Sequence, residues 1–221
     1  MSGTSMGAGL RAAGHLIQAS LATVRAPCLV WIFGHSYVAR GARRADVRPN
    51  GRQLGFSRDV AVLRWLGFSG MVWSRVLPEL QRFVGLDRVP NVLVLHVGGN
   101  DLGVQPMREL VRDIKNDLFR IWTQYPGLIT VWSDIVPRST WRTARSVERL
   151  NKARIKVNRA VSGFVIRNGG VAVRHVDLES RGEEYWIRDG VHLNAVGMDL
   201  WALALQEGVE RALGVWGNSH A

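Results

Sequence analysis

The sequence predicts an α/β protein built on a mostly parallel sheet, and two patterns support this fold class. From Leu29 onward, short apolar runs alternate with longer amphipathic segments, which is typical of consecutive β-α units. The apolar runs are continuous, which indicates strands covered on both faces. The expected strands are residues 29–33, 60–66, 91–97, 128–133 and 171–176.

The longer segments between these runs predict helices. In residues 107–125, Leu110 and Ile114 fall on one helical face, and basic side chains lie on or near the other. Residues 143–167 and 196–213 follow the same pattern.

Length and composition fit one globular domain. The chain has 221 residues, of which 47% are hydrophobic, and a single core is common at this size. We expect a poorly ordered or loosely helical segment over residues 1–27 and one domain over residues 28–221. Cys28 is the only cysteine, which excludes an internal disulfide. The sequence contains no apolar run long enough for a transmembrane segment.

The N-terminal segment leaves the compartment open. Asp46 is the first acidic residue of the chain, and an acid-free amphipathic leader is also typical of mitochondrial transit peptides. We expect a cytoplasmic protein, with a nuclear or mitochondrial location as the alternatives. The oligomeric state cannot be predicted from the sequence.

The net charge of +11 comes mainly from arginine. Such a surplus favours non-specific binding of nucleic acid through phosphate contacts, although a solvated basic surface without a ligand is an equal alternative. Arg138, Arg142 and Arg145, with Trp141 among them, are candidates for a basic aromatic patch on this arginine-rich surface. The simpler interpretation of these residues is a solvated helix start.

Reactive groups follow the predicted strands at the edge where α/β sheets bind ligands. Ser36 follows the first strand, and Asp189 and His192 precede the last predicted helix. A serine hydroxyl becomes a nucleophile when a neighbouring base takes its proton, and that base needs a third group to orient it. Ser36, His192 and Asp189 provide these roles, and the three-residue spacing lets Asp189 meet His192 in one turn. We therefore expect them to form a catalytic triad.

Acyl transfer also requires donors for the negatively charged oxygen of the tetrahedral intermediate. The backbone amides of Ser36 and Gly70 and the side-chain amide of Asn100 each follow a different strand, so they are the candidates for this oxyanion hole. Simpler interpretations remain: Ser36 can cap a helix beginning at Tyr37, Gly70 can serve only a turn, and Asn100 can shape a turn.

Taken together, the polar turns resemble a known family. Residues 34–36 (Gly-His-Ser), 67–70 (Gly-Phe-Ser-Gly), 98–101 (Gly-Gly-Asn-Asp) and 189–192 (Asp-Gly-Val-His) resemble the sequence blocks of SGNH (GDSL-like) hydrolases, in the family's order. The resemblance implies a three-layer α/β/α sandwich with a five-stranded parallel sheet in flavodoxin-like order. It also implies a serine esterase that hydrolyses acetyl or short acyl esters of small molecules or lipids through an acyl-enzyme, with neither cofactor nor metal.

One position departs from the family pattern. The first block usually has Asp where this chain has His35, which leaves the hydrogen bonding around Ser36 open. His35 and His96 are also alternatives to His192 as the base, although His96 lies within an apolar strand. Residues 92–102 and 132–138 resemble SGNH domains encoded in vertebrate transposable elements. The alternative function is therefore a nucleic-acid-associated module with weak or no hydrolase activity.

Overall fold

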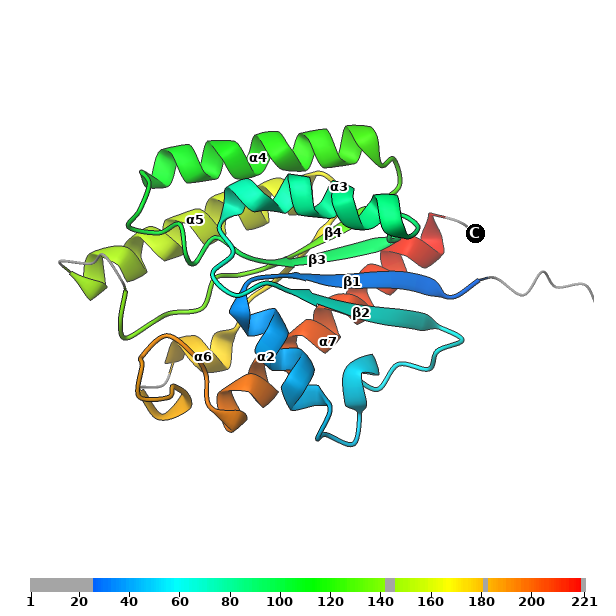
Figure 1. Ribbon diagram of the computed structural model, residues 1–221. Helices are drawn as coiled ribbons and strands as arrows, with labels where there is room; N and C mark the ends of the chain where they lie inside the picture. The colour runs from blue at the N-terminus through cyan, green and yellow to red at the C-terminus, as the bar shows by residue number, and fades with distance from the viewer. Residues whose placement is uncertain (1–25, 142–145, 181–182, 220–221) are drawn as a thin grey trace, which may run out of the picture.

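The computed structural model describes residues 26–141, 146–180 and 183–219, and its centre is one sheet of parallel strands (Figure 1). The strand order is β2-β1-β3-β4-β5, and every neighbouring pair is parallel. This arrangement confirms the predicted α/β class, the five-stranded sheet and the flavodoxin-like order. The strands are β1 (Cys28–Gly34), β2 (Ala61–Gly67), β3 (Val92–His96), β4 (Ile129–Ser133) and β5 (Val171–Val173).

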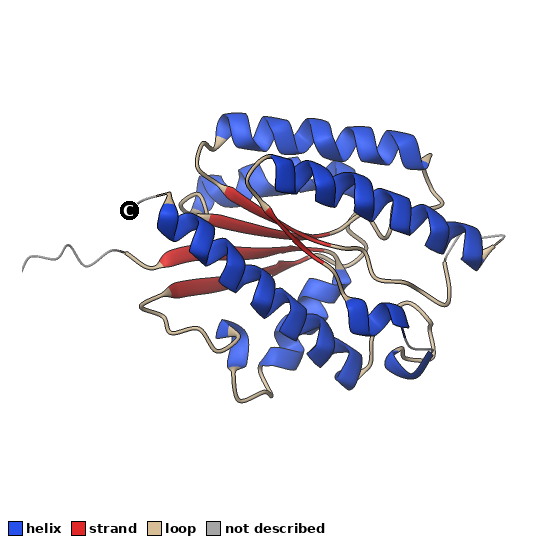
Figure 2. Ribbon diagram, turned by 180° about the vertical axis from the view of Figure 1, so that it is seen from behind, coloured by secondary structure: helices blue, strands red, loops and turns tan. Residues whose placement is uncertain are grey.

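Helices cover both faces of the sheet, as the three-layer prediction requires. Figure 1 shows α3, α4 and α5 on one face, with α2, α6 and α7 on the other, and Figure 2 shows α7 running diagonally across the sheet. The α-helices are α2 (Ser36–Ala45), α3 (Val76–Leu86), α4 (Met107–Gln124), α5 (Val147–Arg167), α6 (Val176–Ser180) and α7 (Ala195–Asn218). Short 3-10 turns are η1 (Gly51–Gln53), η2 (Trp73–Arg75) and η3 (Glu183–Tyr185).

The continuous apolar runs form two hydrophobic cores because successive strand residues point to opposite faces. In β1, Trp31 and Phe33 pack with the core under α3, α4 and α5, whereas Val30 and Ile32 pack with the core that contains Trp201 of α7. Every residue of β1 is buried, which explains why this strand has no polar alternation.

Helices α4, α5 and α7 correspond to the three predicted helices, with different ends. Helix α5 begins at Val147, where the Ser146 hydroxyl accepts a hydrogen bond from the Arg149 amide at 3.3 Å. The predicted start of this helix, residues 143–145, lies outside the described residues. Helix α7 continues to Asn218, so Gly214 does not end it at residue 213 as predicted.

The prediction of a strand over residues 171–176 is wrong in its second half. Strand β5 ends at Val173, and α6 begins at Val176. Val176 is 57% exposed, so it cannot continue a strand that is covered on both faces. Asp177 and Glu179 in the first turn of α6 favour a helix start at this point.

Gly67, at the end of β2, provides a test of this packing. A Cβ atom added there would overlap the backbone of Ala39 in α2, so we expect Gly67→Ala to lower the free energy of unfolding by about 1–3 kcal/mol or more. Gly85→Ala is the matched control, because nothing lies within 4 Å of its added Cβ and alanine favours the helix by up to about 1 kcal/mol. Urea denaturation measures both, and equal stability of the two variants would contradict the predicted overlap.

Candidate active site

The carboxyl ends of β1, β2 and β3 meet at one edge of the sheet, and hydrogen bonds hold their turns together. The Phe68 amide donates to the Gly34 carbonyl at 2.9 Å, and the His35 amide donates to the His96 carbonyl at 3.2 Å. The turns expected to carry the site therefore lie next to one another in the fold.

The structure brings Ser36, His192 and Asp189 together. The Ser36 Oγ atom lies 2.9 Å from His192 Nε2, although the two residues are 156 positions apart in the sequence. On the other side of the imidazole ring, His192 Nδ1 lies 2.6 Å from Asp189 Oδ2. Hydroxyl, imidazole and carboxylate thus form one hydrogen-bonded chain, an arrangement in which the imidazole can accept the serine proton.

Asp189 is held as a carboxylate. Its Oδ1 atom accepts hydrogen bonds from the backbone amides of Val191 and His192, each at 2.8 Å. Burial by itself would raise the pKa of Asp189, but hydrogen bonds from the His192 ring and from these two amides outweigh it and lower the pKa to about 2. The charged carboxylate can therefore orient the Nδ1–H group of the imidazole at neutral pH.

The turn that carries these residues is held from two sides. The buried Tyr37 hydroxyl donates to the Val191 carbonyl at 2.7 Å. The amides of Ser139 and Thr140 donate to the Gly190 carbonyl at 3.0 and 3.1 Å. Gly190 has a left-handed φ of +64°, and a Cβ atom there would collide with the side chains of Ser139 and Thr140. The glycine thus permits the close contact that fixes the turn.

His35 caps the helix that begins with Ser36. It is the N-cap of α2, and its Nδ1 atom accepts a hydrogen bond from the Tyr37 amide at 3.3 Å. The cap is therefore His35, and the alternative in which Ser36 caps the helix is wrong. Burial lowers the pKa of His35 well below its usual value, and the charges of Arg138 and His192 lower it further. His35 is thus uncharged at neutral pH.

The three candidate oxyanion donors lie in the adjoining turns. Ser36 begins α2, so its amide is one of those without a partner inside the helix. Gly70 is exposed with a left-handed φ of +70°, and nothing lies within 4 Å of its added Cβ position. The Asn100 side chain donates through Nδ2 to the Met71 carbonyl at 2.9 Å, which ties its turn to that of Gly70. The nitrogen of an asparagine side chain carries two hydrogens, so Nδ2 can donate one further hydrogen bond.

Asp101 holds the loop that carries Gly70. Both oxygens of its buried carboxyl group accept from the Trp73 amide, at 2.9 and 3.0 Å. The Trp73 ring is itself buried, donates to Asp117 at 2.9 Å and borders a cavity of about 390 Å³. Asp101 therefore acts on the shape of the site through the backbone.

His96, the other alternative base, makes its hydrogen bond to a buried serine of β4. His96 Nδ1 lies 2.8 Å from the Ser133 hydroxyl, which lies 2.8 Å from His175 Nε2, and all three side chains are buried. Burial lowers the pKa of His96 well below its usual value. His96 is therefore a core histidine, and it is His192 that contacts the Ser36 hydroxyl.

Sequence reasoning missed the role of Arg138. Its guanidinium is buried, lies 4.9 Å from the centre of the Trp141 ring and donates from Nη2 to Asn100 Oδ1 at 3.3 Å. Trp141 is buried as well, and α5 begins only at Val147. For Arg138, both the basic patch and the solvated helix start are therefore wrong. Arg142 and Arg145 lie outside the described residues. The available signal was the position of Arg138 shortly after β4, at the ligand-binding edge.

The described residues contain neither a metal-binding cluster nor a membrane-spanning helix. Among the described residues, no group of three or more His, Cys, Asp or Glu side chains is arranged to hold a metal ion. In the same part of the chain, every helix is too short or too polar to cross a membrane.

Comparison with solved structures shows the same fold in ester hydrolases. A GDSL-like lipase from Bacteroides thetaiotaomicron is 16% identical with a TM-score of 0.66, covering 92% of this chain and 97% of that chain. A family 3 carbohydrate esterase from Clostridium thermocellum is 17% identical with a TM-score of 0.65, covering 85% of this chain and 97% of that chain. A psychrotrophic esterase from Pseudoalteromonas sp. is 14% identical with a TM-score of 0.63, covering 84% of this chain and 98% of that chain.

By sequence alone, the chain matches no protein-family model and no curated protein. The structural similarity therefore establishes the fold, including its layers and sheet order. None of these three protein names refers to a transposable element or to nucleic acid. The resemblance to transposable-element domains and the expected nucleic-acid partner therefore gain no support from the comparison.

The buried Asp101 carboxyl group predicts a pH-dependent stability. Burial raises its pKa to about 6, against the hydrogen bond from the Trp73 amide and the charge of Arg138. The folded protein therefore binds this proton more strongly than the unfolded chain, whose Asp pKa is about 3.9, and the contribution of Asp101 to stability rises as pH falls from 7 toward 4. The stability of the parent relative to Asp101→Asn should increase by roughly 2 kcal/mol between pH 7 and pH 4.5.

Chemical denaturation at several pH values measures this difference. Asp46→Asn is the matched control, because a hydrogen bond from Arg52 lowers the pKa of Asp46 and any contribution from it is lost as pH falls. A difference between the parent and Asp101→Asn that did not change with pH would contradict the raised pKa.

Proposed function

We propose that this chain is a serine esterase of the SGNH type that hydrolyses acetyl or short acyl esters. The observation that carries the proposal is the hydrogen-bonded chain from Ser36 Oγ through His192 to Asp189. In this proposal Ser36 is the nucleophile, His192 is the base and Asp189 orients the base.

The first half-reaction forms an acyl-enzyme. His192 Nε2 takes the proton as Ser36 Oγ attacks the ester carbonyl carbon, and the carbonyl oxygen becomes the oxyanion. The amides of Ser36 and Gly70 and the Asn100 side chain donate to this oxyanion. The protonated imidazole then gives its proton to the departing alcohol, which leaves the acyl group on Ser36.

The second half-reaction returns the enzyme to its starting state. His192 takes a proton from a water molecule, which attacks the acyl carbon and forms a second oxyanion at the same donors. Collapse of this intermediate breaks the bond to Ser36 Oγ, and His192 returns the proton to the serine. The products are a carboxylic acid and the free enzyme, and every proton moves through groups of this chain.

The comparisons support the class of substrate. The solved structures of the same fold include a lipase and two esterases, one of which is described as inhibited by monoethylphosphonate. Phosphonates form tetrahedral adducts that resemble the intermediate described above, and we extend this susceptibility to Ser36 as part of the proposal. A second function in nucleic-acid binding is not proposed, because Arg138 and Trp141 of the candidate basic patch are buried and the names of these three proteins do not mention nucleic acid.

Labelling with a fluorophosphonate probe tests the nucleophile. We expect the parent protein to be labelled and Ser36→Ala to remain unlabelled, because the variant lacks the hydroxyl that His192 contacts. Ser133→Ala is the matched control, since this buried serine hydroxyl contacts His96 and His175. Labelling of both the parent and Ser36→Ala would move the nucleophile elsewhere, and labelling of neither would contradict the proposed activity.

The Asn100 side chain tests the oxyanion hole. Removal of one such donor typically costs ~10²- to 10³-fold in turnover, so Asn100→Ala should lower kcat for p-nitrophenyl acetate by about that factor. The loss should fall on kcat rather than on KM, because the oxyanion exists only during the reaction. Hydrolysis at the parent rate would show that Asn100 does not act as a donor.

A further inference from the structure

Arg138 contacts Asn100, one of the proposed oxyanion donors. The residue follows β4 in the loop of residues 134–141, and only 6% of its surface is exposed. Its Nη2 atom donates to Asn100 Oδ1 at 3.3 Å, and its side chain would also meet a Cβ atom added at Gly99. A buried guanidinium is costly to desolvate, so its place beside this turn requires favourable partners.

The contacts of Asn100 permit one orientation of its amide group. Nδ2 donates to the Met71 carbonyl at 2.9 Å, while Oδ1 accepts from Arg138. If the amide were turned by 180°, its NH₂ group would face the guanidinium donors and its oxygen would face the Met71 carbonyl oxygen. Both contacts would then be unfavourable, so Arg138 and Met71 together direct the remaining Nδ2 hydrogen.

Arg138 also changes the strength of this donor. A hydrogen bond from a charged guanidinium is stronger than one between neutral groups, and hydrogen bonds in a chain polarise one another. Electron density drawn toward Oδ1 of Asn100 leaves the Nδ2–H group more positive. The chain from guanidinium through amide to oxyanion would therefore place positive charge where negative charge develops.

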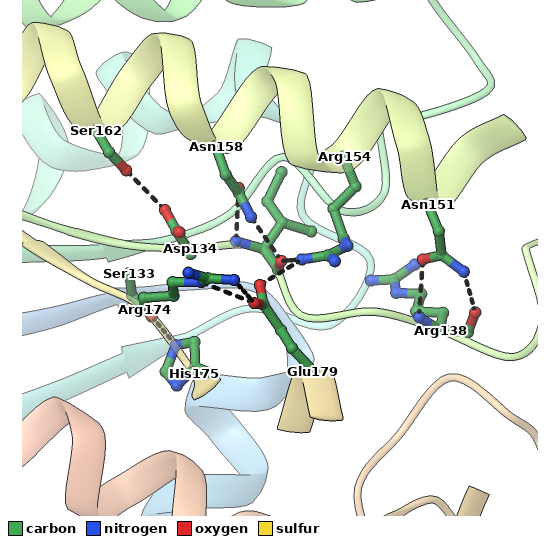
Figure 3. Close-up of polar contacts among 11 residues, drawn as sticks. Ser133, Asp134, Arg138, Asn151, Arg154, Asn158, Ser162, Arg174, His175 and Glu179 are labelled. Atoms are coloured by element: carbon green, nitrogen blue, oxygen red, sulfur yellow. Dashed lines mark hydrogen bonds and ion pairs between the residues drawn. The ribbon is translucent and has the colours of Figure 1, made fainter. Parts of the chain in front are cut away.

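A polar stripe on α5 holds the loop that carries Arg138. Figure 3 shows its four side chains pointing from one helix face toward the loop: Asn151, Arg154, Asn158 and Ser162. Asn151 Nδ2 donates to the Arg138 carbonyl at 3.1 Å, and Asn151 Oδ1 accepts from the Arg138 amide at 3.4 Å. Asn158 bonds both the amide and the carbonyl of Ile135 at 2.9 Å. The loop backbone is thus fixed on both sides of the segment that leads to Arg138.

Two further side chains complete the stripe. Arg154 donates to the Ile135 carbonyl at 2.8 Å and pairs with Glu179 at 3.2 Å, and the Ser162 hydroxyl donates to Asp134 at 2.7 Å (Figure 3). Arg154 is as buried as Arg138, but its partners are the loop backbone and α6. Of these two arginines, Arg138 is the one whose guanidinium reaches a proposed catalytic donor.

We propose that Arg138 is a positioning residue of the esterase, which orients and polarises the Asn100 amide toward the oxyanion. This inference rests on the proposed function, because it assigns Arg138 to the same reaction. It also predicts that Arg138 acts through Asn100, which separates it from a residue that merely supports the fold.

A double-mutant cycle of Arg138→Met and Asn100→Ala tests the proposal, with p-nitrophenyl acetate as the substrate. Arg138→Met should lower kcat by roughly 10- to 100-fold, the value of one charge-assisted hydrogen bond, with KM changed by less than about threefold. In the Asn100→Ala background, the same substitution should change kcat by less than about threefold, because the group through which Arg138 acts is absent. Equal losses in both backgrounds, or an unchanged kcat in the parent, would overturn the proposal.

Arg44→Met is the matched control for the loss of one positive charge. Arg44 pairs with Asp199 at 2.7 Å between α2 and α7, so its removal should leave kcat unchanged. A loss of kcat in Arg44→Met as large as that in Arg138→Met would overturn the proposal. If near-UV circular dichroism shows that Arg138→Met does not fold, Arg138→Lys replaces it in the same cycle, because lysine keeps the positive charge but is one bond shorter and lacks the planar donor pair. Arg138→Lys should lower kcat less than the roughly 10- to 100-fold expected for Arg138→Met, and this loss should also disappear in the Asn100→Ala background.

Ser36→Ala separates the failure of this inference from the failure of the proposed function. If Ser36→Ala hydrolyses the ester as fast as the parent, the proposed function fails. If Ser36→Ala and Asn100→Ala both lose activity while Arg138→Met does not, the proposed function stands and the role of Arg138 is wrong.

Discussion

The parallel pairing of β1 with both β2 and β3 is the constraint on which the candidate site depends. Because these strands run in the same direction, their carboxyl ends deliver three turns to one edge of the sheet. Ser36, Gly70 and Asn100 lie in these turns. Antiparallel pairing with either neighbour would send one of the turns to the opposite edge. The close contacts of Gly34 with His96 and of Gly67 with Ala39 are what allow the turns to meet.

A second constraint joins the two halves of the site. The loop of residues 134–141 donates to Asn100 through Arg138 and to the Gly190 carbonyl through the Ser139 and Thr140 amides. The proposed oxyanion donor and the turn that carries His192 are therefore attached to the same loop. That loop is in turn bonded to α5 by side chains on one helix face. A rigid helix thus supports groups that come from distant parts of the sequence.

The arginine surplus has structural uses that net charge does not reveal. Arg138 and Arg154 are buried and hold internal contacts, while Arg44 joins α2 to α7 through Asp199. Exposed arginines such as Arg52 and Arg82 pair with neighbouring carboxylates. Net charge counts all of these equally, although an arginine that is buried or paired contributes less to the direct binding of a polyanion than an exposed, unpaired one.

Much of the fold could be predicted from the sequence, because apolar runs and helical periodicity are local patterns. The strands around β1, β3 and β4 and the helices α4 and α7 follow directly from them. Helix α3 was not predicted, since Pro78 and Gly85 interrupt its pattern, and β5 was extended too far because Arg174 and Val176 gave no clear end.

The sequence by itself also determined the residue types of the site and their order along the chain, including the Asp189 and His192 pair, whose contact needs only one turn. Only the tertiary structure places Ser36 2.9 Å from His192 and turns Arg138 inward to Asn100. These facts depend on contacts between segments far apart in the sequence, and such contacts are set by how strands pair and helices pack. Local patterns report which face of an element is apolar, but they do not report which distant side chain will meet it.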